Sequence, residues 1–236
     1  MALGIASSVP FAITSTALAA EPPEQIEGGL VRVAKGRLDH VYLLPGASFG
    51  NYDRVRIDPV DVSFSPSWKP NDSRRSPSQR LTADDIEKIR NTVAEEFHKS
   101  FERELSNGGY SIANEDGPDV LRLTPRIVNL YVNAPDKPTA GITRTYTTSA
   151  GHMTLDLTLR DSTTGQYLAR AVDTHQDLQG GGFRLQITNS VTNIGAARAA
   201  FSKWARALRQ GLDEAKAAAA KESPSKYAEG AGASPR

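Results

Sequence analysis

The sequence predicts a mixed α+β domain, a two-layer sandwich in which two amphipathic helices pack on one face of a mostly antiparallel sheet. The patterns follow one another along the chain in the order strand, strand, helix, strands, helix. Each helical pattern carries a single apolar stripe and therefore covers one surface. The clearest strands alternate apolar and polar residues, which is typical of a sheet with one buried and one solvated face.

Composition narrows the class of protein. The chain has 236 residues, of which 39% are hydrophobic and 23% charged, as in ordinary globular proteins. It contains no cysteine, which excludes disulfides, thiolate metal sites and a cysteine nucleophile. Lys and Arg number 28 against 27 acidic residues, so no overall field favours nucleic acid or an anionic membrane. We therefore expect no nucleic-acid partner.

The first twenty residues predict export. They are apolar or small and end in Ala17-Leu18-Ala19-Ala20, which places small residues where signal peptidase cuts. No basic residue precedes Arg32, which departs from the usual basic start of a secretory signal. The segment is too rich in Ser and Thr to span a membrane, which takes about 20 strongly apolar residues. We expect cleavage near Ala19 or Ala20, a periplasmic product without a transmembrane span, and no lipid anchor because the cut offers no cysteine.

Four segments follow from composition and periodicity. Residues 1–20 are the predicted signal peptide, and residues 21–36 form a flexible, polar lead-in. Residues 37–217 form a single α+β domain. Residues 218–236 are rich in Lys, Ser, Pro, Gly and Ala and are predicted to be a disordered tail.

Two short β regions open the domain. Residues 41–44 form a strand that Pro45-Gly46 stops. Residues 55–64 form a second β region whose alternation runs through Pro59. Because proline has no N–H to donate, this strand is expected at an edge of the sheet or at a bulge.

The first helix is predicted from Thr82 to Ser106. Thr82 and Asp85 resemble a capping box, with Asp in place of the usual Glu. Asn107-Gly108-Gly109 ends the helix. Its apolar stripe is Ile86, Ile89, Val93, Phe97, Phe101 and Leu105.

The second helix is predicted from Asn193 to Ala218, and Gly211 lowers its stability modestly. Its residues recur every three or four positions along one side. They are Ala197, Phe201, Trp204, Ala205, Leu208 and Leu212.

Between the helices, residues 120–132 and 153–159 predict strands. The second leads through Ser162-Thr163-Thr164-Gly165, a hairpin loop with Gly placed for a left-handed conformation. If this loop sets the register, Asp161 faces Gln166, Leu159 faces Leu168 and Leu155 faces Val172. Leu157 then faces Arg170, which is the one misfit.

The same register suggests a metal site. Asp173, His175 and Asp177 alternate along one strand, and His152 falls opposite His175. Two imidazoles and two carboxylates on one face can ligate a divalent metal such as Zn²⁺. Solvation alone also predicts four polar residues on the wet face of a sheet, and such a face lacks the orienting partners on which metal sites rely. We adopt this second interpretation and expect neither a metal nor another cofactor.

The long connection at residues 133–143 leads into Thr143-Arg144-Thr145-Tyr146-Thr147-Thr148. Long loops that carry an aromatic residue and hydrogen-bonding side chains often recognise partners. Candidate binding residues are Tyr131, Asn133, Arg144 and Tyr146. The alternative is an edge strand in which Thr and Tyr serve β propensity. No catalytic constellation stands out.

Several blocks in order resemble a known family. They include Leu81-Thr82-Ala83-Asp84-Asp85, Gly117-Pro118-Asp119-Val120-Leu121-Arg122-Leu123, Asn129-Leu130-Tyr131-Val132-Asn133-Ala134-Pro135, Leu159-Arg160-Asp161-Ser162 and Thr188-Asn189-Ser190-Val191-Thr192-Asn193. Over roughly residues 35–215 the chain is similar to the bacterial domain-of-unknown-function family 3313. The resemblance implies a Gram-negative envelope protein, often a lipoprotein, without an established activity. It carries over no catalytic residue, and this chain departs from the lipoprotein members by lacking the acylated cysteine.

These observations predict a non-enzymatic periplasmic or envelope domain that binds a protein partner through its sheet edge, the 133–148 loop or the tail. The alternative is a small-ligand or cell-wall-fragment binder with a pocket between the helices and the sheet. A deep pocket lined by Tyr131, Tyr146 or Trp68 would favour the ligand binder. An exposed apolar patch would favour the protein binder.

Overall fold

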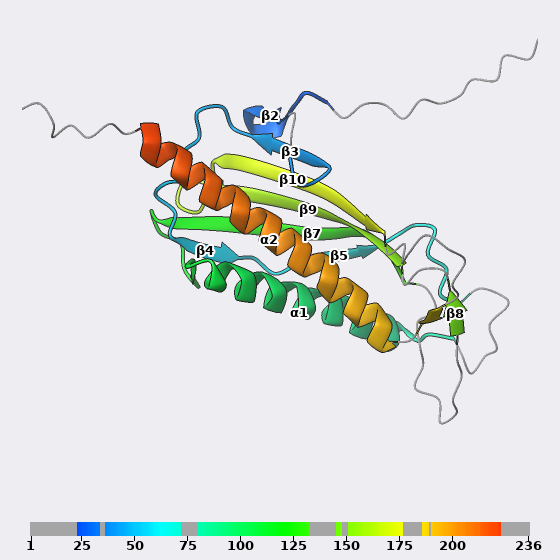
Figure 1. The fold of residues 1–236 in the computed structure, drawn as a ribbon. Helices are drawn as coiled ribbons and strands as arrows, with labels where there is room; N and C mark the ends of the chain where they lie inside the picture. Colours follow the sequence, from blue (N-terminus) through cyan, green and yellow to red (C-terminus); the bar gives the residue numbers. More distant parts are fainter. Residues whose placement is uncertain are drawn as a thin grey trace, which may run out of the picture.

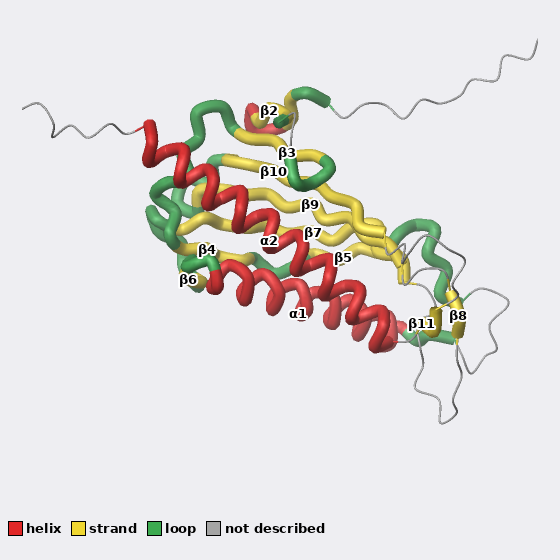
Figure 2. Tube along the Cα trace, viewed as in Figure 1, coloured by secondary structure: helices red, strands yellow, loops and turns green. Residues whose placement is uncertain are grey.

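The chain folds as a mixed α+β domain, as predicted. The computed structural model describes residues 23–33, 36–71, 80–132, 145–147, 151–176, 186–188 and 190–222. Its two long helices are α1 (Ala83–Asn107) and α2 (Ser190–Glu222). Figure 1 shows α2 running across the strands of the main sheet with α1 alongside it. Figure 2 shows a small ribbon, β8 (Thr145–Thr147) paired with β11 (Gln186–Thr188), apart from the main sheet.

The main sheet has nine strands and is mixed. Its order is β1-β2-β3-β10-β9-β7-β4-β6, with β5 also paired to β7. The strands from β1 to β7 in this order pair antiparallel, whereas β4 and β5 run parallel to β7, and β6 runs parallel to β4. The sheet is therefore largely antiparallel with a parallel end. The strands are β1 (Gln25–Ile26), β2 (Leu30–Arg32), β3 (His40–Leu43), β4 (Arg54–Ile57), β5 (Asp61–Phe64), β6 (Ser111–Ile112), β7 (Val120–Val132), β9 (Gly151–Asp161) and β10 (Tyr167–Gln176).

The pairing of β4 and β5 with β7 is interrupted at the position of two prolines, Pro59 and Pro125. The predicted strand at residues 55–64 is two strands, because Pro59 separates β4 from β5. Strand β4 pairs with β7 as far as Leu123, and β5 resumes the pairing at Arg126. Pro125 falls in this break, so a residue without an N–H is tolerated within a central strand.

Both helices pack into the core through the apolar stripes that the sequence predicts. The capping box of α1 is present: the Thr82 N–H donates to the Asp85 carboxylate at 2.8 Å, and the Asp85 N–H donates to the Thr82 hydroxyl at 3.2 Å. Phe97 packs edge-on against Phe201 of α2, with ring centroids 5.4 Å apart. Both rings are fully buried, and burying such a side chain contributes about 1.5–3 kcal/mol. One core cluster joins them to inward-facing strand residues such as Leu121, Leu123, Ile127, Leu155 and Leu157.

Two predicted boundaries are corrected. The flexible lead-in was expected over residues 21–36, but β1, a 3₁₀ turn at Glu27–Gly29 and β2 lie within it. Strand β2 pairs with β3, and Leu30 is fully buried, which gives this segment a packing role that its polar composition hides. The tail was expected from residue 218, but α2 continues to Glu222. The remaining residues of the predicted tail, and the predicted signal peptide, lie outside the described residues.

The predicted register of the β9–β10 hairpin is wrong beyond its first pair. Tyr167 faces Arg160 as expected, but a bulge then shifts the pairing by one residue, so that Ala169 faces Leu159 and Arg170 faces Thr158. The bulge lets two successive apolar residues, Leu168 and Ala169, both become buried. It also removes the misfit of Arg170 against Leu157, because the Arg170 guanidinium donates two 2.8 Å hydrogen bonds to Asp156.

Asp161 holds the hairpin turn. Its carboxylate accepts hydrogen bonds from the N–H groups of Thr163 and Thr164, at 3.0 and 2.7 Å, and from the Tyr52 hydroxyl at 2.7 Å. These donors, led by the Thr164 N–H, lower the pKa of Asp161. Burial, and then the same carboxylate, raises the pKa of Tyr52 to about 12.

We predict that Asp161→Asn makes the free energy of unfolding depend less on pH in the acid range. Because the folded-state pKa of Asp161 is lowered, its charge stabilises the fold above the unfolded-state pKa near 4, and this contribution is lost as the pH falls through the folded-state value. The amide keeps an acceptor for the turn but loses the charge, so we expect a loss of about 1 kcal/mol at pH 7 that shrinks steadily as the pH falls below 4. Urea denaturation at a series of pH values measures it.

The matched control is Glu115→Gln, which makes the same charge change at an exposed position. It should lower the stability by less than about 0.5 kcal/mol across the same pH series. A loss for Asp161→Asn that does not depend on pH would contradict the prediction.

Candidate functional site

The structure describes two of the four predicted binding residues. Tyr131 lies near the end of β7 and stacks on His152, with ring centroids 5.0 Å apart. Tyr146 lies in β8, where it pairs with Ile187 of β11. Asn133 and Arg144 lie outside the described residues. The proposed cluster of these four residues thus stays a prediction.

The register shift separates the four predicted metal candidates. His152 faces Gln176 rather than His175, and His175 faces Met153. Met153 belongs to the core, so its neighbour His152 lies on the other face of the sheet, where it stacks on Tyr131. Asp173 faces Leu155 and lies on the core side, not on a wet face, and Asp177 lies outside the described residues. Among the residues that the structure describes, no group of three or more His, Asp or Glu is arranged to hold a metal ion.

Asp173 is instead a buried carboxylate that joins three segments. It is 2% exposed. It accepts a 2.6 Å hydrogen bond from the Trp204 Nε1–H of α2 and a 2.9 Å bond from the Asp39 N–H, which precedes β3. The Asp39 carboxylate in turn accepts from the Thr174 N–H of β10 at 2.9 Å. The ammonium of Lys203 lies 3.4 Å from Asp173.

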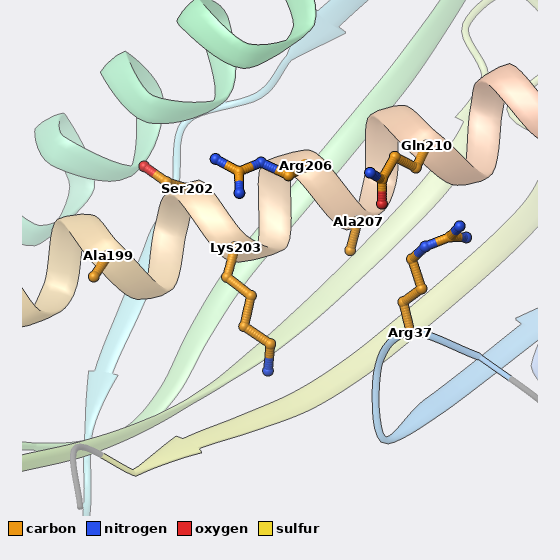
Figure 3. A pocket seen from close by; sticks show the side chains of 7 residues that line it. All are labelled: Arg37, Ala199, Ser202, Lys203, Arg206, Ala207 and Gln210. Carbon is orange, nitrogen blue, oxygen red and sulfur yellow. The ribbon is translucent and has the colours of Figure 1, made fainter. Parts of the chain in front are cut away.

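A groove of about 450 Å³ lies beside this carboxylate, along the outer side of α2. We call it the α2 groove and define it by its lining residues, Arg37, Ala199, Ser202, Lys203, Arg206, Ala207 and Gln210. Figure 3 shows Lys203 and Arg206 projecting from α2 in different directions, and Arg37 reaching from the segment before β3 toward the part of α2 that carries Gln210. The two alanines leave room between the longer side chains.

Two of the three cations of the groove, Lys203 and Arg206, are more exposed than the carboxylates that they contact. The side chain of Lys203 is 55% exposed and that of Asp173 3%. Arg206 is 59% exposed and lies 3.8 Å from Glu104, which is 17% exposed. Arg37 makes hydrogen bonds of 2.6 and 2.9 Å to Glu214, and this pairing raises the pKa of Arg37 and lowers that of Glu214. At Lys203 and Arg206 the groove therefore presents positive charge to solvent, whereas at Arg37 the charge is balanced by the exposed Glu214.

A seam of ion pairs fixes the rotation of α2 against α1. Arg198 of α2 donates hydrogen bonds of 2.6 and 2.7 Å to Glu96 of α1, and this contact lowers the pKa of Glu96. Arg209 of α2 donates to Glu104 of α1 at 3.2 Å. With this seam on one side of α2 and the buried Trp204 below, the stripe that lines the groove faces outward.

The sheet face opposite the core also carries charge, arranged as a row of ion pairs. Arg122 donates hydrogen bonds of 3.0 and 2.9 Å to Asp58. Arg126 lies between two carboxylates, 3.4 Å from Asp61 and 3.9 Å from Asp156. Asp156 also pairs with Arg170 of the neighbouring strand β10. This row is a network of ion pairs that crosses the sheet, without an unmatched cation among these residues.

The sequence could have revealed part of the groove. Residues 199, 203, 206 and 210 recur at intervals of three or four and therefore share one face of α2, a pattern that periodicity finds. Arg37 lies far away in sequence, and only the folded chain brings it to that face.

The comparisons with known proteins identify the family. The model of DUF3313, described as a protein of unknown function, matches residues 29–208, so the chain belongs to this family. No curated protein matches the chain.

Several solved structures are similar at low identity. A PelC dodecamer from Paraburkholderia phytofirmans is 11% identical, over 72% of this chain and 96% of that one, with a TM-score of 0.36. Protein XCC0632 from Xanthomonas campestris is 13% identical, over 72% and 88%, with a TM-score of 0.38. A minor lipoprotein from Acinetobacter baumannii is 9% identical, over 69% and 94%, with a TM-score of 0.29. Scores this low assign no function to the chain.

We predict that Trp204→Phe destabilises the fold by about 2 kcal/mol, because it removes the shortest hydrogen bond to a buried carboxylate while keeping an aromatic ring. Chemical denaturation followed by far-UV circular dichroism measures the change.

The matched control is Trp68→Phe. The Trp68 Nε1–H donates to the Val132 carbonyl at 3.0 Å in a half-buried position, so its loss should cost about 1 kcal/mol or less. Equal losses for the two variants would show that Asp173 does not depend on Trp204.

Proposed function

We propose that this member of the DUF3313 family is a non-enzymatic binding or accessory domain of the bacterial cell envelope, acting by protein–protein interaction. The observation that carries the proposal is the α2 groove. It is a furrow along one helix, open to solvent, in which five of the seven lining residues have polar or charged side chains. A furrow of this form suits a segment of polypeptide laid along it.

The lining of the groove does not favour the alternative, a small-ligand or cell-wall-fragment binder. Small-molecule sites enclose most of their ligand and are lined mainly by apolar and aromatic side chains. Two of the three aromatic residues expected in such a pocket are engaged elsewhere. Trp68 stacks on Phe64 with ring centroids 4.2 Å apart, and Tyr131 stacks on His152.

The proposed interaction is polar. Within the described part of the chain, Leu43, at 38%, is the large hydrophobic residue that is exposed. An apolar docking patch of the kind that marks many protein interfaces would need several such residues together. Charged and hydrogen-bonding side chains must therefore supply the contacts.

The state of Asp173 supports a non-enzymatic role. This buried carboxylate lies next to the groove and is the group there that could act as a base. Its two oxygens already accept hydrogen bonds from Trp204 and the Asp39 N–H. A carboxylate that is 2% exposed and held in this way serves as a structural acceptor, since a general base must come within hydrogen-bond reach of a substrate proton.

The core supports the two-layer arrangement that the proposal assumes. Residues from both helices and from the inward side of the strands belong to one hydrophobic cluster. With the helices on that side, the row of ion pairs on the opposite face is left to solvent, and the α2 groove lies on the outer side of the helix layer.

The proposed location rests on the signal peptide predicted over residues 1–20. None of the described helices is long and apolar enough to cross a membrane. We predict that the full chain, expressed in a Gram-negative host, is released by osmotic shock with a mass that corresponds to cleavage near Ala19 or Ala20. Intact mass spectrometry of the shock fluid measures this. An uncleaved chain retained in spheroplasts would contradict export.

Site-specific crosslinking tests the proposed interaction. A photoreactive amino acid is placed at Gln210 in the groove of the full chain and, as the control, at the exposed Asn91 on α1. After irradiation of cells that naturally carry this protein, we expect a discrete protein adduct from position 210 and none from position 91. Absence of an adduct at position 210, or the same adducts from both positions, would overturn the proposal.

A further inference from the structure

The chemistry of the α2 groove indicates what kind of segment fits it. Its seven lining residues include three cations, Arg37, Lys203 and Arg206, and no acidic residue. The hydroxyl of Ser202 and the amide of Gln210 add hydrogen-bonding groups at two further positions. A groove lined in this way is complementary to negative charge.

The native ion pairs leave these cations available. Lys203 and Arg206 reach their partner carboxylates over 3.4 and 3.8 Å, and both cations are more than half exposed. Arg37 pairs closely with Glu214, but both of these side chains are exposed. Because these cations stay exposed beside their partners, an incoming carboxylate can share them without displacing the native carboxylates.

The spacing of the cations matches an extended chain. Lys203 and Arg206 are three residues apart on α2 and therefore neighbours on its surface, about 5–6 Å apart at Cβ. In an extended polypeptide, alternate side chains lie on one side at intervals of roughly 6.5 Å. Two acidic residues separated by one other residue can thus meet both cations, and Ala199 and Ala207 leave room for the backbone.

We infer that the α2 groove binds an acidic, extended segment of the partner protein, with alternate carboxylates pairing with Lys203, Arg206 and Arg37. This inference rests on the proposed function and adds the chemistry of the partner. It assigns recognition to charged side chains that the folded backbone already brings to one surface of the domain.

The direct test uses a short fluorescein-labelled peptide of alternating Glu and Ser, titrated with the full chain and followed by fluorescence anisotropy. We expect saturable binding that weakens steeply as the ionic strength rises, because the contacts are exposed and screened by salt. The double variant Lys203→Gln/Arg206→Gln should bind about tenfold more weakly or worse. A labelled Ser-only peptide should not bind.

Two variants separate recognition from folding. Lys88→Gln/Lys99→Gln makes the same change of charge on the exposed side of α1 and should bind within about twofold of the native chain. Arg37→Gln alters the groove without touching Asp173 or Glu104, and it should also weaken binding. Far-UV circular dichroism confirms that each variant is folded.

Three results would overturn the inference: no binding of the acidic peptide by the native chain, an equal loss in the α1 control, or unchanged binding in both groove variants. Vesicles containing phosphatidylglycerol test another anionic partner. Binding to them that depends on Lys203 and Arg206, without binding to the peptide, would assign the groove to a membrane surface instead.

The crosslinking experiment distinguishes this inference from the proposed function. If the adduct at position 210 persists in the Lys203→Gln/Arg206→Gln chain and resists competition by the acidic peptide, the protein interaction stands and the acidic-segment inference fails. If the native chain forms no adduct, the proposed function itself fails. Loss of the adduct in the double variant, together with competition by the peptide, supports both.

Discussion

The buried carboxylate of Asp173 is the constraint on which the arrangement of this domain depends. A carboxylate removed from water is costly unless donors surround it. Here the donors come from separate segments, the indole of Trp204 in α2 and the backbone N–H of Asp39 before β3. Satisfying one buried charge therefore fixes the position of α2 over β10 and brings the Asp39 segment to its side. Those two elements are the walls of the α2 groove.

The β-bulge near the start of β10 makes this constraint possible. Without the shift, alternation from the hairpin turn would leave Asp173 on the solvated face, opposite Thr154. The bulge turns Asp173 inward to Trp204 and turns Arg170 outward to Asp156. One extra residue in β10 thus places the Asp173 carboxylate in the core, where it orients α2. The same extra residue keeps the Arg170 guanidinium out of the core.

Sequence reasoning predicted the elements well and their relations less well. The structure confirms three features that follow from local chemistry: capping at Thr82, the apolar stripes of both helices, and the extent of β7. The position of the bulge could not be predicted, because strict alternation assumes an unbroken ladder of paired residues. The predicted misfit of Leu157 against Arg170 was the one sign in the sequence that the register was wrong.

The binding candidates show the same limit. Tyr131 was correctly placed near a strand end, but the α2 groove needs a contact between Arg37 and a helix far along the chain. Likewise, pairing of β2 with β3 and burial of Leu30 turned a segment of polar composition into part of the sheet. Contacts between distant segments decide such features, and a single sequence does not display them.

Arg206 takes part both in the contact of α2 with α1 and in the lining of the α2 groove. On one side it approaches Glu104, which also accepts a hydrogen bond from Arg209 in the seam between the helices. On the other side it lines the groove. Because Glu104 keeps Arg209 as its closer partner, drawing Arg206 toward an incoming carboxylate leaves no acidic group of the seam unpaired. The cation of the groove can therefore be engaged while the helix pair that positions it stays intact.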